Sequence, residues 1–229
     1  MTNNNDTENN QVITRPVLFT SIILCAINLI FGAIVYPRLP EKVPTHWNFA
    51  GEVDGWGSPF QGAFLIPLIM IGVLILMFFL PKIDPKRKNY AKMGKAYSGI
   101  ILVMMIFFTV LQFGSLGSTL GYFSIHSVPK VIMLGVGVLL IVIGNYMGRL
   151  KHNYFAGIKT PWTLANEEVW QRTHKMAGPI WIVGGILMMA VGFVPAQFTL
   201  GLFIIIMLIL ALVPMVYSYV IFKKLEGEK

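Results

Sequence analysis

The sequence is short of charged residues and almost lacks cysteine. Only 12% of its 229 residues are Asp, Glu, Lys or Arg, whereas a soluble domain carries about 25%. Cys25 is the one cysteine, so no disulfide can form within the chain. The low charge excludes an ordinary soluble domain. Together with 55% hydrophobic residues, it predicts an integral membrane protein.

Six apolar runs are long enough for a helix to cross a hydrocarbon layer of about 30 Å. They predict an all-α, multi-pass protein of the plasma membrane, with spans at about 16–36, 62–80, 96–116, 131–147, 178–194 and 198–222. Residues 1–15 are expected to form a disordered cytoplasmic tail. A helix pair with a structured outer loop, 37–61, would occupy 16–95, and a four-helix region with an inner loop, 149–177, would occupy 96–229.

The positions of the basic residues predict the orientation of the chain. The formal net charge of +8 suggests nucleic acid, but the basic residues cluster at the ends of the apolar runs, so no direct nucleic-acid binding is expected. With the N-terminus inside, all 18 Lys and Arg residues except Arg38, Lys42 and Lys130 fall on the inner side. Inner loops are usually the positive ones, so both termini are predicted to be cytoplasmic.

The predicted spans contain no Asp, Glu, Lys or Arg, and their polar residues are Asn28, Gln112 and Asn145. Coupled transporters usually need ionisable groups at depth, so small-solute transport is kept only as an alternative. The segment Gly144–Gly148 has the small-xxx-small spacing that lets helices approach closely. We interpret it as packing within the bundle, with Asn145 hydrogen-bonded across the contact. Homodimerisation is the alternative, and the oligomeric state is left open.

The outer loop is rich in turn-forming and polar residues. Ala50-Gly51, Asp54-Gly55 and Gly57-Ser58 are turn signals, with Asp54-Gly55 the strongest. The loop would be compact, and Trp47, Phe49 and Trp56 would anchor it at the membrane interface. A surface that recognises an external ligand is the functional alternative. Its candidate residues are His46, Trp47, Asn48, Gly51, Asp54, Gly55, Trp56, Gly57 and Ser58.

Three residues of the outer loop, His46, Glu52 and Asp54, are suitable metal ligands. Their spacing fits neither an EF-hand nor another familiar ligand pattern. We therefore expect no metal and no cofactor, and a metal-dependent membrane enzyme that uses these residues is an alternative hypothesis.

The inner loop predicts a capped helix. Asn166 is a plausible N-cap, and Glu167 and Glu168 would oppose the positive end of the helix dipole. Glu167, Trp170 and His174 share one face, and Glu168 pairs with Arg172 on another. No serine or cysteine nucleophile accompanies the Glu and His, so we predict no enzyme. An amphipathic helix at the interface is the simpler interpretation, and docking of a cytoplasmic partner is the functional one.

Both loops resemble known sequence patterns. "LPEKVPTHWNFAGEVDGWGS" resembles the N-terminal domain of unknown function of many bacterial membrane proteins. "GNYMGRLKHNYFAGIKTPWTLANEEVWQRTHKMAGPIW" resembles the signature region of the SdpI family, which includes immunity proteins against a secreted killing peptide. The resemblance covers about residues 16–225 and makes 96–229 the SdpI-like region. Lys159 stands where the family pattern has arginine.

This resemblance implies a protein that protects its cell from a membrane-active toxin peptide. It also implies signalling, in which a small repressor protein is held at the membrane once the toxin is present. The partners would then be membrane lipid, a toxin peptide outside and a repressor inside. The residues assigned to inner-loop docking are Asn145, Gly157, Lys159, Thr160, Pro161, Trp162, Thr163, Glu168, Trp170 and His174.

Overall fold

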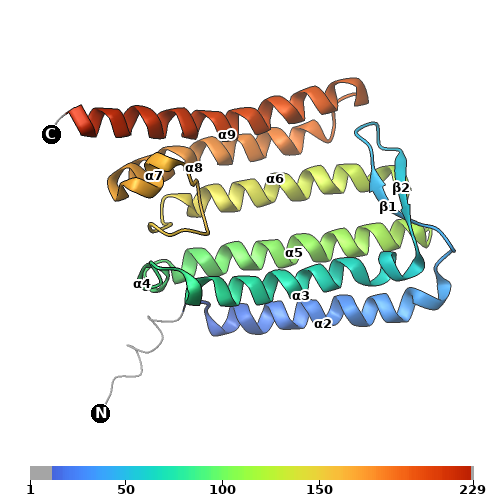
Figure 1. Ribbon diagram of the computed structural model, residues 1–229. Coiled ribbons are helices and arrows are strands. Elements are labelled where there is room, and N and C mark those ends of the chain that lie inside the picture. Colours follow the sequence, from blue (N-terminus) through green and yellow to red (C-terminus); the bar gives the residue numbers. More distant parts are fainter. Residues whose placement is uncertain (1–11, 228–229) are drawn as a thin grey trace, which may run out of the picture.

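Six long helices lie side by side in the computed structural model, which describes residues 12–227 (Figure 1). Each is long and apolar enough to cross a membrane, and this confirms the six predicted spans. Residues 1–11 of the expected disordered tail lie outside the described residues. The six helices are α2 (Arg15–Val35), α3 (Pro59–Ile83), α5 (Gly94–Thr119), α6 (Val128–Met147), α8 (Glu167–Val191) and α9 (Ala196–Gly227).

The helices form two groups. α2, α3 and α5 pack against one another, α8 packs against both α6 and α9, and α5 joins the groups by also packing on α6. In Figure 1 the two groups follow one another across the molecule in chain order. Because α5 touches both groups, the division after residue 95 does not coincide with a gap in packing, and the predicted domain boundary stays a prediction.

Polar residues inside the first group connect its helices. Asn28 of α2 is buried, and its amide donates to Thr109 Oγ1 of α5 at 2.9 Å. Gln112 of α5 donates to the Ala63 carbonyl of α3 at 2.8 Å. The prediction for Asn145 is wrong, because this residue is exposed on α6 rather than hydrogen-bonded within a helix contact.

Glycines allow α6 and α8 to cross closely. A Cβ on Gly144 would lie 2.8 Å from the Gly178 carbonyl oxygen, and one on Gly178 would lie 2.9 Å from that of Gly144. Gly137 of α6 and Gly185 of α8 make the same kind of close backbone contact further along the two helices. Close packing within the bundle is therefore confirmed for Gly144. The second glycine of α6 at this helix crossing is Gly137, not the predicted Gly148. Gly148 lies past the crossing, where an added Cβ would make only an ordinary contact.

Between residues 12 and 227, the fold is helical except for one β-hairpin in the predicted outer loop. β1 (Val43–Trp47) pairs antiparallel with β2 (Val53–Gly57), with irregular register around His46. The hairpin turn lies at Asn48–Glu52, where Gly51 has a φ of 85°. Asp54-Gly55, expected to be the strongest turn, is instead inside β2. This position of the strand requires glycine, because an added Cβ would lie 2.6 Å from His46 Cβ.

Four short helical segments complete the connections: η1 (Tyr36–Arg38), α4 (Lys88–Ala91), η2 (Ile125–Ser127) and α7 (Pro161–Ala165). The helix predicted to start at Glu167 continues into the fifth span, because Glu167–Val191 is one continuous helix despite Pro179. Asn166 caps that helix as predicted, with its Oδ1 accepting from the N–H groups of Glu168 and Val169.

The two ends of the bundle differ in charge. The hairpin occupies one end, and both the N-terminal side of α2 and the C-terminal end of α9 lie at the other (Figure 1). Among the described residues, every Lys and Arg except Arg38, Lys42 and Lys130 belongs to the end away from the hairpin. We call these the hairpin end and the basic end.

Candidate functional site

The tip of the hairpin is held by Asn48. Its Oδ1 accepts from the N–H groups of Ala50 at 2.9 Å and Glu52 at 3.0 Å, and its backbone pairs with Glu52. These contacts are those of an Asx turn, in which a side chain replaces a backbone acceptor. Asn48 therefore gives the tip a fixed shape, and it directs Phe49 outward from the strands towards α9.

Other predicted recognition residues join the hairpin to α3. Ser58 caps α3: its Oγ accepts from the Gln61 N–H, and its own N–H donates to Gln61 Oε1 at 2.8 Å. This reciprocal pair is a capping box. Gly57 precedes it in β2, where an added Cβ would lie 2.8 Å from Thr45 and Gln61. Ser58 and Gly57 thus have structural roles, whereas Trp56 is 57% exposed and free to contact another molecule.

His46 and Asp54 face each other across the two strands, with Nδ1 and Oδ1 2.5 Å apart. Glu52 instead accepts from the Asn48 amide at 3.2 Å. In residues 12–227 no group of three His, Cys, Asp or Glu side chains is placed to hold a metal ion. The metal-enzyme alternative therefore lacks its ligand set among the described residues, since only two of its three members meet.

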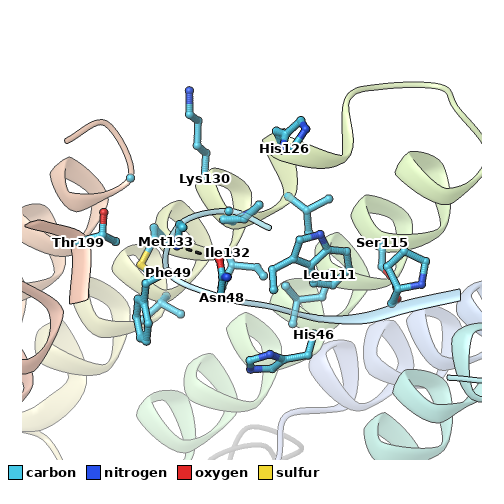
Figure 2. Close-up of a pocket in the computed structure, with 18 of the residues that line it drawn as sticks. His46, Asn48, Phe49, Leu111, Ser115, His126, Lys130, Ile132, Met133 and Thr199 are labelled. Atoms are coloured by element: carbon cyan, nitrogen blue, oxygen red, sulfur yellow. Dashed lines mark hydrogen bonds between the residues drawn. The ribbon is translucent and has the colours of Figure 1, made fainter. Parts of the chain in front are cut away.

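A cavity of about 720 Å³ lies beneath the hairpin, between the two helix groups (Figure 2). Its walls are mainly apolar and come from β1, the hairpin turn, α3, α5, η2, α6, the end of α8 and α9. Four predicted recognition residues line it: His46, Trp47, Asn48 and Gly51. No sequence pattern connects the further lining residues, which include Phe49, Leu65, Leu111, Met133, Val136, Thr199 and Phe203.

The hairpin tip reaches across this cavity to the far helix group. The Phe49 ring lies 5.3 Å from the ring of Phe203 on α9, with a tilted geometry. Phe49 and Met133 both line the cavity, and in Figure 2 the Lys130 side chain extends away from the hairpin. The hairpin therefore spans from α3 to α9 and covers the space between them.

Few polar groups reach the cavity. Trp47 Nε1 is buried and makes no hydrogen bond within the described structure. His126 and Lys130 contribute polar side chains from η2 and α6. A mainly apolar pocket with a few polar groups is the usual form of a ligand site. This one suits an apolar segment.

At the basic end, a buried cluster of polar side chains joins the predicted inner loop to the α3–α4 connection. Asp84 is 2% exposed and accepts from the Tyr90 hydroxyl at 2.9 Å and from the backbone N–H groups of Tyr154 and Lys86. Asn153 uses its side chain to bind the backbone of residues 151, 155 and 156. Burial and the neighbouring Asp84 carboxylate both raise the pKa of Tyr90, so this hydroxyl remains a donor.

His152 adds a titratable group to the same cluster. Its Nδ1 accepts from the Lys86 ammonium at 2.9 Å, and its carbonyl accepts from Asn89. Burial lowers the pKa of His152, and the positive charge of Lys86 lowers it further, while Glu167 and Asp84 act in the opposite direction. The imidazole is therefore neutral at physiological pH.

Trp170 and His174 fill the centre of the inner loop. Their rings stack at 4.1 Å, and the Trp170 indole donates to the Leu150 carbonyl at 2.9 Å. His174 Nδ1 donates to the Trp170 carbonyl, and its Nε2 accepts from the Ile158 N–H. Gly157 has a φ of 124°, and an added Cβ would lie 2.5 Å from His174 Nε2. The two aromatic residues are thus buried inside the loop.

The Thr160-Pro161-Trp162-Thr163 segment forms a second capping motif. Thr160 and Thr163 cap α7 reciprocally, and Thr160 Oγ1 lies 3.0 Å from Ser218 Oγ of α9. Trp162 packs on Tyr219 with ring centroids 5.0 Å apart. These residues fasten the loop to α9, so their immediate role is structural.

The exposed part of the inner loop is smaller than predicted. Lys159, Pro161 and Glu168 are exposed, and Glu168 pairs with Arg172 as predicted. Glu167 is exposed and His174 is buried, so the structure gives no support to an acid–base pair. No sequence motif pointed to Asp84, Tyr90, Asn153 or the exposed Tyr154 and Phe155. The one available signal was Asp84, the only acid in the basic segment 82–95.

Together these features define a class: a six-helix integral membrane protein with a capped apolar cavity at one end and a hydrogen-bonded loop at the other. The family model for the SdpI/YfhL protein family matches residues 149–218, and that for a domain of unknown function matches residues 23–71. The chain is 30% identical over 209 residues to a protein named Immunity protein SdpI from Bacillus subtilis (strain 168), covering 91% of this chain and 97% of that protein. The protein belongs to the SdpI family and is a multi-pass protein of the plasma membrane.

No solved structure is significantly similar to this chain. The two matched segments each contain one of the two regions described above. The 23–71 match includes the hairpin, and the 149–218 match includes the inner loop and α8.

Proposed function

We propose that this protein is an immunity protein that protects its cell by binding a membrane-active peptide in the cavity beneath the hairpin. The main support for this proposal is the cavity itself, which is large, mainly apolar and covered by a hairpin of fixed shape. The curated relative is an immunity protein by name. Binding, rather than a chemical reaction, is the function that such a surface supports.

The proposed orientation places the hairpin end outside the cell and the basic end in the cytoplasm. The concentration of Lys and Arg at the basic end supports it, because cytoplasmic ends of membrane proteins are enriched in these residues. A secreted peptide would then meet the hairpin first. An apolar peptide segment would enter the cavity and gain burial against Leu111, Met133 and Phe203.

The proposal extends to the basic end, where a small cytoplasmic repressor would dock. The exposed aromatic residues Tyr154 and Phe155, next to the exposed Lys159, support this part. Aromatic side chains are enriched among binding residues. Because the buried polar cluster fixes the loop through Asp84 and Asn153, the docking surface would be preformed.

Filling the cavity tests the proposal. Val136 lines the cavity, and Val138, on the same helix, is 45% exposed on the outer surface. Val136→Trp should abolish protection of a sensitive host, because the new ring occupies the space for the peptide. Val138→Trp is the matched control and should protect like the wild type. Survival under peptide challenge is measured with equal membrane levels of each protein.

Two outcomes would refute different parts of the proposal. If cells with and without the wild-type protein are killed equally, the immunity function is wrong. If Val136→Trp protects fully, immunity stands but the cavity is not the binding site. A flux assay in liposomes addresses the transport alternative. The amide N–H groups of Asn28 and Gln112 do not favour transport, because both donate hydrogen bonds between helices.

A further inference from the structure

A second cavity, of about 480 Å³, lies at the basic end and takes no part in the proposed peptide binding. Three segments meet around it: the residue before α2, the junction of α4 and α5, and the end of α6. Each of these segments is where a membrane-spanning helix begins or ends. The cavity therefore lies at the level where the helices leave the apolar layer of the membrane.

Four basic side chains surround this cavity: Lys92, Lys95, Arg149 and Lys151. Among residues 12–227, none of the four forms a salt bridge with an acidic group. A cavity with four cations and no described counter-ion favours a ligand with negative charge.

The surface that leads away from the cavity is apolar. Lys95 begins a row of partly or fully exposed residues along α5 at helical spacing, which continues through Gly99, Leu102, Ile106, Val110 and Phe113. Residues three or four apart share one face of a helix. A ligand with its negative group at Lys95 could therefore extend an apolar chain along this row.

We propose that this basic cavity binds the headgroup of an anionic glycerophospholipid from the cytoplasmic leaflet. The phosphate group lies among Lys92, Lys95, Arg149 and Lys151, and the acyl chains lie along the α5 row. Basic pockets between membrane helices on the cytoplasmic side bind anionic headgroups in this way. The lipid occupies the junction of α2, α5 and α6, and so it connects the two helix groups.

The test uses the full-length protein purified in a neutral detergent. Native mass spectrometry measures the retention of added phosphatidylglycerol and phosphatidylcholine of equal chain length, and a third arm adds inorganic phosphate. The wild type should retain phosphatidylglycerol about tenfold more strongly than phosphatidylcholine. Equal retention of the two lipids would overturn the proposal. Displacement of phosphatidylglycerol by equimolar phosphate would also overturn it, because the cavity would then be a site for a free anion.

A pair of double variants locates the lipid. Lys95→Gln with Arg149→Gln should reduce the preference for phosphatidylglycerol to near that for phosphatidylcholine. Lys223→Gln with Lys224→Gln removes the same charge from the same end of the molecule, on α9, and should keep the wild-type preference. Retained preference in the first variant, or equal loss in both, would refute the assignment to this cavity. The result is independent of peptide protection, which is measured in a separate assay.

Discussion

At the scale of single residues, several side chains that the sequence predicts to be functional have structural roles instead. Asn48, Ser58 and Thr160 each stabilise a turn or a helix start, so their polar groups are used within the chain. Trp47 is the clearest opposite case. It lines the cavity, and its buried indole N–H has no hydrogen-bond partner within the described structure.

His152 carries a prediction about pH. Because its pKa is lowered in the folded protein, the unfolded chain binds more protons once the pH falls below about 6.5. Stability should therefore decrease as the pH falls from 7.5 to 5.5, by at most about 1.4 kcal/mol per pH unit from this residue. The groups that face it are Lys86, Asp84, Glu167 and His174.

Thermal unfolding of the purified protein across this pH range measures the effect. His152→Gln should flatten the dependence on pH relative to the wild type. His126→Gln, at an exposed histidine, is the control and should leave the dependence unchanged. Parallel curves for His152→Gln and the wild type would show that this residue does not contribute to the pH dependence.

At the scale of elements, the crossing of α6 and α8 depends on backbone contact. Gly144→Ala places a methyl group 2.8 Å from the Gly178 carbonyl oxygen, and neither backbone can move without separating the helices. We expect a loss of about 1–3 kcal/mol of stability, as for other overpacked contacts. Gly72→Ala in α3 is the control, because nothing lies within 4 Å of the added methyl group. It should be neutral or stabilising, since alanine favours a helix.

The thermal midpoints of the two variants in the same detergent provide the comparison. A Gly144→Ala protein with a wild-type midpoint would mean that the helices tolerate a wider crossing than the structure has. Equal losses in both variants would show that the effect is not specific to the crossing.

Sequence patterns predicted the elements better than the contacts between them. The six helices follow from apolar length, and the Asn166 cap and the Glu168–Arg172 pair follow from local spacing. The hairpin was missed because Asp54-Gly55 has the composition of a turn. Its place in a strand is set instead by the tip at Asn48–Gly51 and by the close contact between Gly55 and His46.

The sites were less predictable because they form from segments far apart in the chain. The cavity combines residues from 44 to 203, and its walls are ordinary apolar residues with no distinguishing pattern. The cluster around Asp84 joins segments about 70 residues apart. Local spacing identifies residues that share a helix face, but it contains no information on which distant helices meet.

At the scale of the whole molecule, the two ends differ in shape and charge, and the proposed function requires the hairpin end to face outward. Cys25 is the one cysteine and is buried, so a Cys25→Ser background allows single cysteines to be placed at either end. Lys42 precedes the hairpin and Lys224 lies near the end of α9, and both are exposed. In intact cells, a membrane-impermeant maleimide should label the Lys42→Cys protein. The Lys224→Cys protein should be labelled only after the membrane is permeabilised.

This expectation follows from the charge asymmetry, because transferring the many Lys and Arg side chains of the basic end across the membrane would be unfavourable. Labelling in the reverse order would place the hairpin in the cytoplasm. A secreted peptide could not then reach the cavity from outside. The peptide would have to bind at the basic end and the repressor at the hairpin end. Labelling of both positions in permeabilised cells is the control that each cysteine is accessible.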